Sequence, residues 1–204
     1  MLHVDAVEPR LTALLRALAE EDALREMRLV GGTALALQLG HRASVDLDFC
    51  GPRLNGSIEA LRERLARHGD VAVLAEGKAL HTYAIDGIKL DIVVSASPWL
   101  ADAVVEGRIR LAGPLDIAAM KLLAITNRGA RKDFVDLAFL LDILTLSAML
   151  DAHDRKYRTE SRFAVLKSLV YFDAAAAEPM PPMLRPVDWT AIRRKVESAV
   201  RPWV

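Results

Sequence analysis

One short segment, LHTYAIDGIKLDIVV at residues 80–94, constrains the fold more than any other stretch of this chain. Residues on both sides of its centre alternate with the period of two that is typical of β-strands. The Asp86-Gly87 pair supplies the positive φ values that a two-residue type I′ turn needs. This turn fixes the register of the two strands, so that Thr82 lies opposite Asp91. Asp91 is therefore expected to share its face of the sheet with small side chains.

The segments around this hairpin alternate between helix and strand up to about residue 112, and the pattern is helical after it. Apolar spacing and capping residues predict the individual elements. In the first part we expect helices at 8–25, 34–39 and 57–68 and further strands at 27–30, 43–49, 71–76 and 107–113. In the second part we expect helices at 114–128, 132–144, 145–157, 160–176 and 188–200. The pattern favours an α/β core at 1–112 and a helical part at 113–204 that packs on it, with no linker long enough to force two independent domains.

Two aspartates interrupt the apolar strand expected at 43–49. Strict alternation puts Val45 on the core face and both Asp46 and Asp48 on the opposite face, which Ser44 shares. The two carboxylates then project side by side, about 7 Å apart at Cα. A divalent cation such as Mg²⁺ or Mn²⁺ removes their mutual repulsion, because it prefers carboxylate oxygens and keeps positions for phosphate and water.

A third acid, Asp91, is expected on a strand of the same sheet, facing the same way as small residues. Three carboxylates allow two metals to be shared, and two metals about 3.5–4 Å apart activate a hydroxyl, hold a triphosphate and stabilise in-line displacement at phosphorus. We therefore predict that Asp46, Asp48 and Asp91 are metal ligands and catalytic residues. The chemistry that this arrangement suits is nucleotidyl transfer.

A glycine pair lies upstream of the acids, at the start of a compact apolar helix. Thr33 is a plausible N-cap for that helix, whose first N–H groups and dipole favour an anion. Gly31 and Gly32 allow a phosphate to approach the backbone closely. We predict that Gly31, Gly32 and Thr33 hold the phosphates of a nucleotide.

These residues resemble a known superfamily. GGT at 31–33, twelve residues, DLD at 46–48 and a later LDI are similar to the motif of the nucleotidyltransferase fold. A second block, DIAAMKLLAITNRGARKDFVDLAFLL at 116–141, makes the resemblance narrower: over residues 28–142 the chain looks like the AbiEii/AbiGii-type nucleotidyltransferases, which are toxins of abortive-infection toxin-antitoxin pairs. The resemblance implies an α+β or α/β fold, with a mixed β-sheet flanked by helices and a C-terminal helical part.

The same resemblance implies the reaction and its partners. The substrate would be a nucleoside triphosphate, the acceptor a tRNA end or a protein, and the antitoxin or repressor a separate protein. In this family the DxD acids, a lysine and a later acid are implicated in activity, which carry over to Asp46, Asp48, Lys121 and one of Asp133 or Asp136. The RxSxD run adds Arg42 and Ser44, which would bind phosphate or support the acids.

The helix at 114–128 gives Lys121 a physical context. Lys121 and Arg128 are seven residues apart and lie nearly on one line of that helix, so both are candidates for neutralising a triphosphate. Asp133 and Asp136, three apart on the next helix, either orient Lys121 or Arg42 or are structural partners of neighbouring basic residues. Both possibilities remain open from the sequence.

Composition limits the location and the partners of the protein more than it limits the reaction. The chain has 27 Lys and Arg and 27 Asp and Glu, so no overall field attracts nucleic acid. No apolar stretch reaches the ~20 residues that span a bilayer, and the single Cys50 cannot form an internal disulfide. We expect a cytoplasmic protein without a membrane role.

Two other functions share the same residues. The chain could be a nucleotide-binding module without transfer activity that acts through a protein partner. It could also be a small-molecule nucleotidyltransferase of the aminoglycoside-modifying kind, which would use the same metal site with a different acceptor pocket.

Overall fold

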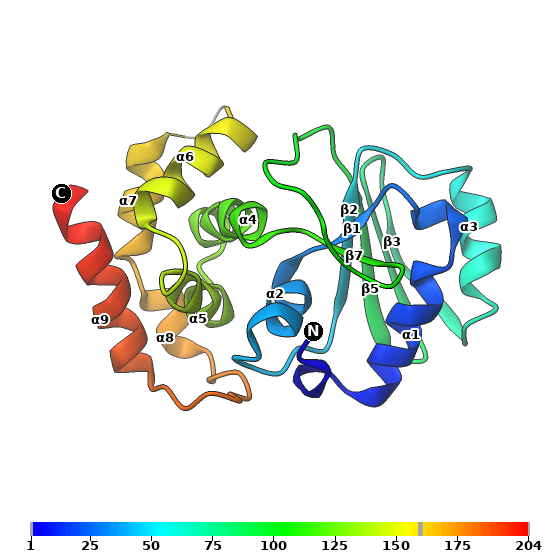
Figure 1. The fold of residues 1–204 in the computed structure, drawn as a ribbon, viewed down its shortest axis with the longest axis horizontal. Helices are drawn as coiled ribbons and strands as arrows, with labels where there is room; N and C mark the ends of the chain where they lie inside the picture. The colour runs from blue at the N-terminus through cyan, green and yellow to red at the C-terminus, as the bar shows by residue number, and fades with distance from the viewer. Residues whose placement is uncertain (1, 159–160, 204) are drawn as a thin grey trace. The chain divides into compact units, whose positions relative to one another are not determined.

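The computed structural model describes residues 2–158 and 161–203, and the chain divides into two compact units (Figure 1). Unit 1 consists of Met1–Gln38, Ser44–Ser97 and Ala103–Ala112. Unit 2 consists of Leu39–Ala43, Pro98–Asp102 and Gly113–Val204. Unit 1 holds the β-sheet, and unit 2 is helical.

The described residues of unit 1 form one seven-stranded mixed sheet in the order β3-β4-β5-β2-β1-β7-β6. The strands are β1 (Arg28–Leu29), β2 (Leu47–Gly51), β3 (Val71–Glu76), β4 (Leu80–Ile85), β5 (Ile88–Val94), β6 (Val104–Glu106) and β7 (Ile109–Leu111). The β2–β5 and β1–β7 pairs are parallel, and the remaining neighbours are antiparallel. The strand predicted at 107–113 is shorter in the structure, because β7 spans Ile109–Leu111 and residues 107–108 form the turn to β6, which was not predicted.

The central hairpin of β4 and β5 has the predicted register. Asp86 and Gly87 have φ values of 49° and 84°, and Thr82 pairs with Asp91. The opposite face of the same strands carries Tyr83 and Leu90, both fully buried. Local turn chemistry was therefore sufficient to place Asp91 correctly.

Helices cover both faces of this sheet: α1 (Pro9–Ala19) and α3 (Ile58–Leu65) lie on one face and α2 (Gly31–Leu39) on the other (Figure 1). Ser57 caps α3, since its side chain accepts from the N–H of Ala60. The helix predicted at 8–25 is shorter than expected, because it ends at Ala19 and is followed by a 3₁₀ turn, η2 (Asp22–Leu24). Another 3₁₀ turn, η1 (Val4–Ala6), precedes α1.

The strand predicted at 43–49 is wrong at its start. β2 begins at Leu47, and before it only an isolated bridge joins Ser44 to Val7. Val45, predicted for the core, is 63% exposed, whereas Ser44 is buried. Hydrogen bonds from α2 hold residues 44–46 out of the ladder, so the period of two applies only from Leu47 onward.

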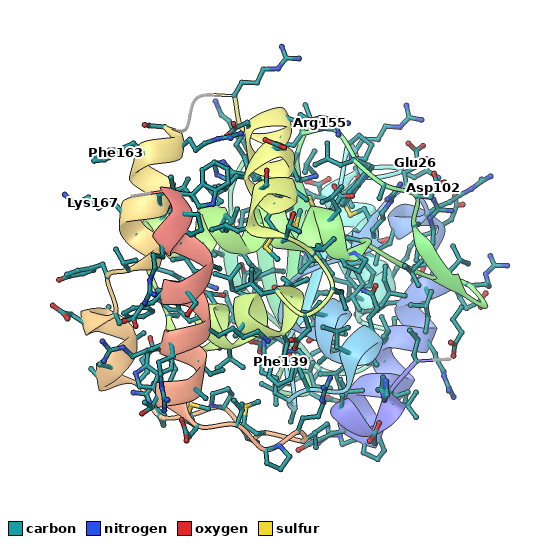
Figure 2. The ribbon with its side chains drawn as sticks, turned by 60° about the vertical axis from the view of Figure 1, so that its left-hand side comes forward. Glu26, Asp102, Phe139, Arg155, Phe163 and Lys167 are labelled. Carbon is teal, nitrogen blue, oxygen red and sulfur yellow. The ribbon has the colours of Figure 1, made fainter. Side chains whose placement is uncertain are left out.

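Unit 2 contains the remaining helices: α4 (Pro114–Asn127), α5 (Arg131–Leu140), α6 (Leu146–Lys156), α7 (Arg162–Leu169), α8 (Asp173–Ala177) and α9 (Trp189–Val200), followed by η3 (Arg201–Trp203). Gly129, with φ 58°, follows α4 as predicted. Phe163 and Lys167 project away from the core side of α7 (Figure 2), which buries Val165 and Leu169.

The helix predicted at 160–176 is divided into α7 and α8, and its expected start at residue 160 lies outside the described residues. The division lets Phe172 bury its ring against Phe134 at 4.9 Å and Trp189 at 5.9 Å. Tertiary packing therefore overrides the local helical pattern. No helix in the described ranges combines the length and apolar character required to cross a membrane.

Candidate active site

Three carboxylates gather on one face of the sheet in unit 1, and we call Asp46, Asp48 and Asp91 the acidic cluster. Asp48 and Asp91 are paired neighbours on the parallel strands β2 and β5. Asp46 lies just before β2, outside the ladder, and its charge still acts on Lys89 of β5. Because side chains alternate along a strand, Asp48, Asp91 and Lys89 face the same side of the sheet.

Both oxygens of Asp91 already have partners. Thr82 Oγ1 donates to Oδ1 at 2.7 Å, and Lys89 Nζ forms an ion pair with Oδ2. Burial alone would lower the pKa of Lys89, but Asp91, with Asp48 and Asp46 nearby, raises it, so this lysine stays charged. Sequence reasoning missed Lys89, although its position two residues before Asp91 in IKLDI was the available signal.

Gly31 brings the backbone directly against the acidic cluster. Its φ is +68°, and a Cβ at this position would collide with the carboxylate of Asp48. The neighbouring Val30 N–H donates to the carbonyl of Asp48 at 2.7 Å, which fixes the two segments side by side. A glycine is required here both for the backbone conformation and for the space that the carboxylate occupies.

Thr33 does not cap α2 as predicted, because the helix begins two residues earlier, at Gly31. Its buried hydroxyl donates to the main-chain carbonyl of Asp46 and lies 2.8 Å from the hydroxyl of Ser44. Ser44 therefore bonds to Thr33 rather than to a carboxylate. Thr33 fixes the backbone that carries Asp46, just before β2.

The ligand atoms that the acidic cluster offers are all carboxylate oxygens, which suit a hard divalent cation. Gly31 has no side chain, and this leaves room for the carboxylate of Asp48. Within the ranges that the structure describes, no three His, Cys, Asp or Glu side chains converge as a ready metal site. Asp91 is instead held by Thr82 and Lys89. The residue types fit a divalent metal, although the three carboxylates do not converge on one point in this structure.

Unit 2 contains a second charged group, which we call the buried ion cluster. Its members are His41, Arg42, Lys121, Arg128, Asp133 and Asp136. Lys121 Nζ lies 2.9 Å from Asp133 Oδ1 and 2.6 Å from Asp136 Oδ2. Both acids are fully buried, and Lys121 is almost completely so. Lys121 thus reaches from α4 to two carboxylates of α5.

The segment Leu39–Ala43 joins this cluster through Asp136. Arg42 binds Asp136 with two nitrogens, Nε at 2.7 Å and Nη2 at 2.9 Å. His41 Nε2 lies 2.8 Å from Asp136 Oδ1, and the ring is fully buried. The sequence had offered Arg42 as a phosphate ligand or as a support for Asp46. In the structure both side chains support Asp136.

Arg128 is the solvent-facing member of the cluster. Its Nε and Nη2 lie 2.9 and 3.1 Å from the two oxygens of Asp133, and its side chain is 57% exposed. With Arg42, Lys121 and Arg128 set against two acids, the cluster has a positive surplus. Arg128 is the member that presents this surplus at the surface.

Mutual neutralisation explains the pKa values of this cluster. Burial would raise the pKa of Asp136, but Lys121 and Arg42 outweigh it and hold the pKa far below its usual range. Burial likewise opposes ionisation of Asp133, and Lys121 with Arg128 still lowers its pKa. The pKa of Lys121 is raised by Asp136 and Asp133, although burial disfavours its charged form. Asp133, Asp136 and Lys121 are therefore ionised at neutral pH.

Comparison with known families decides the identity. The profile described as "Nucleotidyl transferase AbiEii toxin, Type IV TA system" matches residues 13–204. The chain belongs to the AbiEii nucleotidyltransferase toxin family. A protein of Aquifex aeolicus, named as uncharacterized, is 37% identical over 161 residues, which cover 74% of this chain and 75% of that protein. This AbiEii-family chain is therefore a nucleotidyltransferase of the toxin-antitoxin type.

Solved structures agree with the fold. JHP933 from Helicobacter pylori has a TM-score of 0.58 at 21% identity, covering 99% of this AbiEii-family chain and 93% of JHP933. MenT4, a nucleotidyltransferase toxin from Mycobacterium tuberculosis, has a TM-score of 0.57 at 16% identity, covering 93% of this chain and 80% of MenT4. The predicted fold class, a nucleotidyltransferase-like mixed sheet flanked by helices, is confirmed.

Proposed function

We propose that this AbiEii-family enzyme transfers a nucleoside monophosphate from a nucleoside triphosphate to an RNA acceptor, with Mg²⁺ or Mn²⁺ held by Asp46, Asp48 and Asp91. The observation that carries the proposal is the register of β2 and β5, which sets Asp48 beside Asp91 while Gly31 lies against the Asp48 carboxylate. A cation bound to this cluster would offset phosphate charge and favour ionisation of the attacking hydroxyl.

The start of α2 is assigned to the phosphates. The first N–H groups of a helix lack partners within it, and here they belong to Gly31, Gly32 and Thr33. The Thr33 side chain has a different role. Its hydroxyl donates to the main-chain carbonyl of Asp46 and contacts the hydroxyl of Ser44. These contacts keep the phosphate-binding backbone and the first metal ligand in a constant relationship.

The buried ion cluster is assigned the binding of an anionic group by unit 2. Arg128 has the exposed side chain that binding an anion requires, and Lys121 and Arg42 add to its positive charge. Asp133 and Asp136 are both fully buried and bonded to these cations. We therefore assign the two acids to positioning Lys121, Arg42 and Arg128 rather than to contact with substrate.

The partners follow from the family and from charge. Unit 2 holds 15 of the 27 Lys and Arg but 12 of the 27 Asp and Glu, a positive surplus that favours an anionic acceptor such as a tRNA end. A separate antitoxin protein would restrain the enzyme in the cytoplasm, where nucleoside triphosphates and tRNA are found.

The test is to incubate the protein with each labelled nucleoside triphosphate, total RNA and Mg²⁺, alongside Asp48→Asn. We expect label transfer to RNA that requires the cation and falls about 10²–10³-fold in Asp48→Asn. Asp70→Asn, which changes an exposed acid of the same unit, should retain transfer. Equal transfer by Asp48→Asn would contradict the metal assignment.

Two other outcomes point to different functions. Tight triphosphate binding without turnover indicates a nucleotide-binding module. Transfer to an aminoglycoside in place of RNA indicates a small-molecule enzyme.

A further inference from the structure

Lys89 is the cation that the structure places on the proposed metal ligands. It precedes Asp91 by two residues on β5, so both side chains face the same side of the sheet. Its ammonium forms an ion pair with Asp91 Oδ2. On β4 its neighbour is Ala84, whose small side chain leaves Lys89 free to lie along the sheet toward Asp91.

The same lysine also lies close to the other two acids. The β2–β5 register sets Asp48 level with Asp91, and the charges of Asp48 and Asp46 both act on Lys89. Lys89 is therefore one ammonium in the neighbourhood of three carboxylates. Neighbouring strands are about 4.8 Å apart, so the Asp48 carboxylate on β2 is within strong Coulomb range of the ammonium on β5.

Only one of the two contacts of Asp91 has to change when a metal binds. Thr82 is neutral and donates to Oδ1, and this bond is compatible with a cation on the other oxygen. Lys89 occupies Oδ2 with a positive charge, which a divalent cation would repel. Because Lys89 is 45% exposed, its ammonium can move into water without burying an unpaired charge.

We propose that Lys89 is a built-in counter-ion of the acidic cluster, which a divalent cation must displace from Asp91. The lysine stabilises the three carboxylates while no metal is bound and weakens metal binding when no nucleotide is present. This inference rests on the proposed function, since it takes Asp46, Asp48 and Asp91 as the metal ligands. It assigns Lys89 a positioning role and not a catalytic one.

The experiment measures Mn²⁺ binding without nucleotide by the loss of the free-ion electron paramagnetic resonance signal. Lys89→Met should bind Mn²⁺ about tenfold more tightly than the unmodified protein, because a repelling charge is gone. Lys89→Arg keeps the charge and should bind like the unmodified protein. Lys78→Met, which removes an exposed lysine charge from the same unit, is the matched control and should also be unchanged.

A second readout separates this role from a purely structural one. Lys89→Met should melt at a lower temperature than the unmodified protein in a metal chelator and gain more from added Mn²⁺. A structural role would lower both melting temperatures equally. Lys89→Gln is measured in parallel, so that a folding defect of the methionine variant cannot hide the result.

Asp48→Asn distinguishes failure of the inference from failure of the proposed function. If Asp48→Asn loses Mn²⁺ binding while Lys89→Met and Lys89→Gln bind no tighter than the unmodified protein, the displacement of Lys89 is wrong and the metal site stands. If Asp48→Asn binds as well as the unmodified protein, or if no variant binds at all, the metal assignment is wrong and the inference with it.

Discussion

The two charged groups of this molecule are built in opposite ways. In unit 2 the buried ion cluster encloses Asp133 and Asp136, which are fully buried and bonded to Lys121, Arg42 and Arg128. In unit 1 the acidic cluster lies on a sheet face where Asp46 and Asp48 are partly exposed. The first group has a positive surplus, and the second sets three carboxylates beside one ammonium.

This difference separates folding from function. Buried ions are tolerated only when they neutralise each other, so the buried ion cluster must be complete for unit 2 to fold well. Like charges gathered at an accessible surface weaken the fold slightly and are retained where a ligand of opposite charge binds. Changing an acid should therefore affect stability in unit 2 and activity in unit 1.

The largest expected effect is that of Asp136→Asn on stability. The change leaves Arg42 and Lys121 buried with one negative charge fewer, which should lower the free energy of unfolding by about 3–5 kcal/mol. Trp99, Trp189 and Trp203 all belong to unit 2, so urea unfolding followed by tryptophan fluorescence reports on this unit.

Two less buried aspartates test whether burial explains the large stability loss expected for Asp136→Asn. Asp142 forms an exposed pair with Lys195, and Asp142→Asn should cost under about 1 kcal/mol. Asp48→Asn, followed by circular dichroism, should also change stability by less than about 1 kcal/mol, although it removes activity. If Asp142→Asn lowers the free energy of unfolding as much as Asp136→Asn does, burial does not explain the effect.

Gly31→Ala should have the next largest effect, and it acts on unit 1. The alanine is strained at a φ of +68°, and its Cβ pushes against the Asp48 carboxylate. We expect a loss of stability of about 1–3 kcal/mol and a clear loss of transfer activity. Gly107→Ala is the control, because Gly107 has a similar φ of +60° and open space for a Cβ. If both variants keep full activity, contact between Gly31 and Asp48 is unimportant for the site.

Lowering the pH should reduce the free energy of unfolding of unit 2, with a smaller effect per pH unit than that of Asp136→Asn. The pKa values of Asp133 and Asp136 are lower when folded than when unfolded, so their contribution is complete above the unfolded value of about 4 and is lost as the pH falls toward the folded values. Each group contributes a slope of about 1.4 kcal/mol per pH unit. Urea unfolding between pH 7 and pH 3 should show a shallower decline in Asp136→Asn. Parallel curves for the two proteins would contradict this role.

Much of the site could be predicted because its pattern is local. The Asp86-Gly87 turn fixed the pairing of Thr82 with Asp91, and the period of two from Leu47 placed Asp48 on the polar face. The positions that failed depend on contacts between distant segments. Val45 is exposed and Ser44 is buried because Thr33, eleven residues before Ser44, holds that segment out of the strand.

The sequence by itself determined the elements that carry the proposed site residues: the glycine pair, the two aspartates, the hairpin with Asp91 and the helices of Lys121 and Asp136. Turn chemistry and side-chain periodicity act over a few residues, so they can be read directly. Only the tertiary structure decided which charges neutralise each other. His41 and Arg42 meet Asp136 across more than ninety residues, and Lys89 meets the acids through a strand register. Coulomb energy depends on distance and burial in the folded chain, and neither is fixed by local sequence.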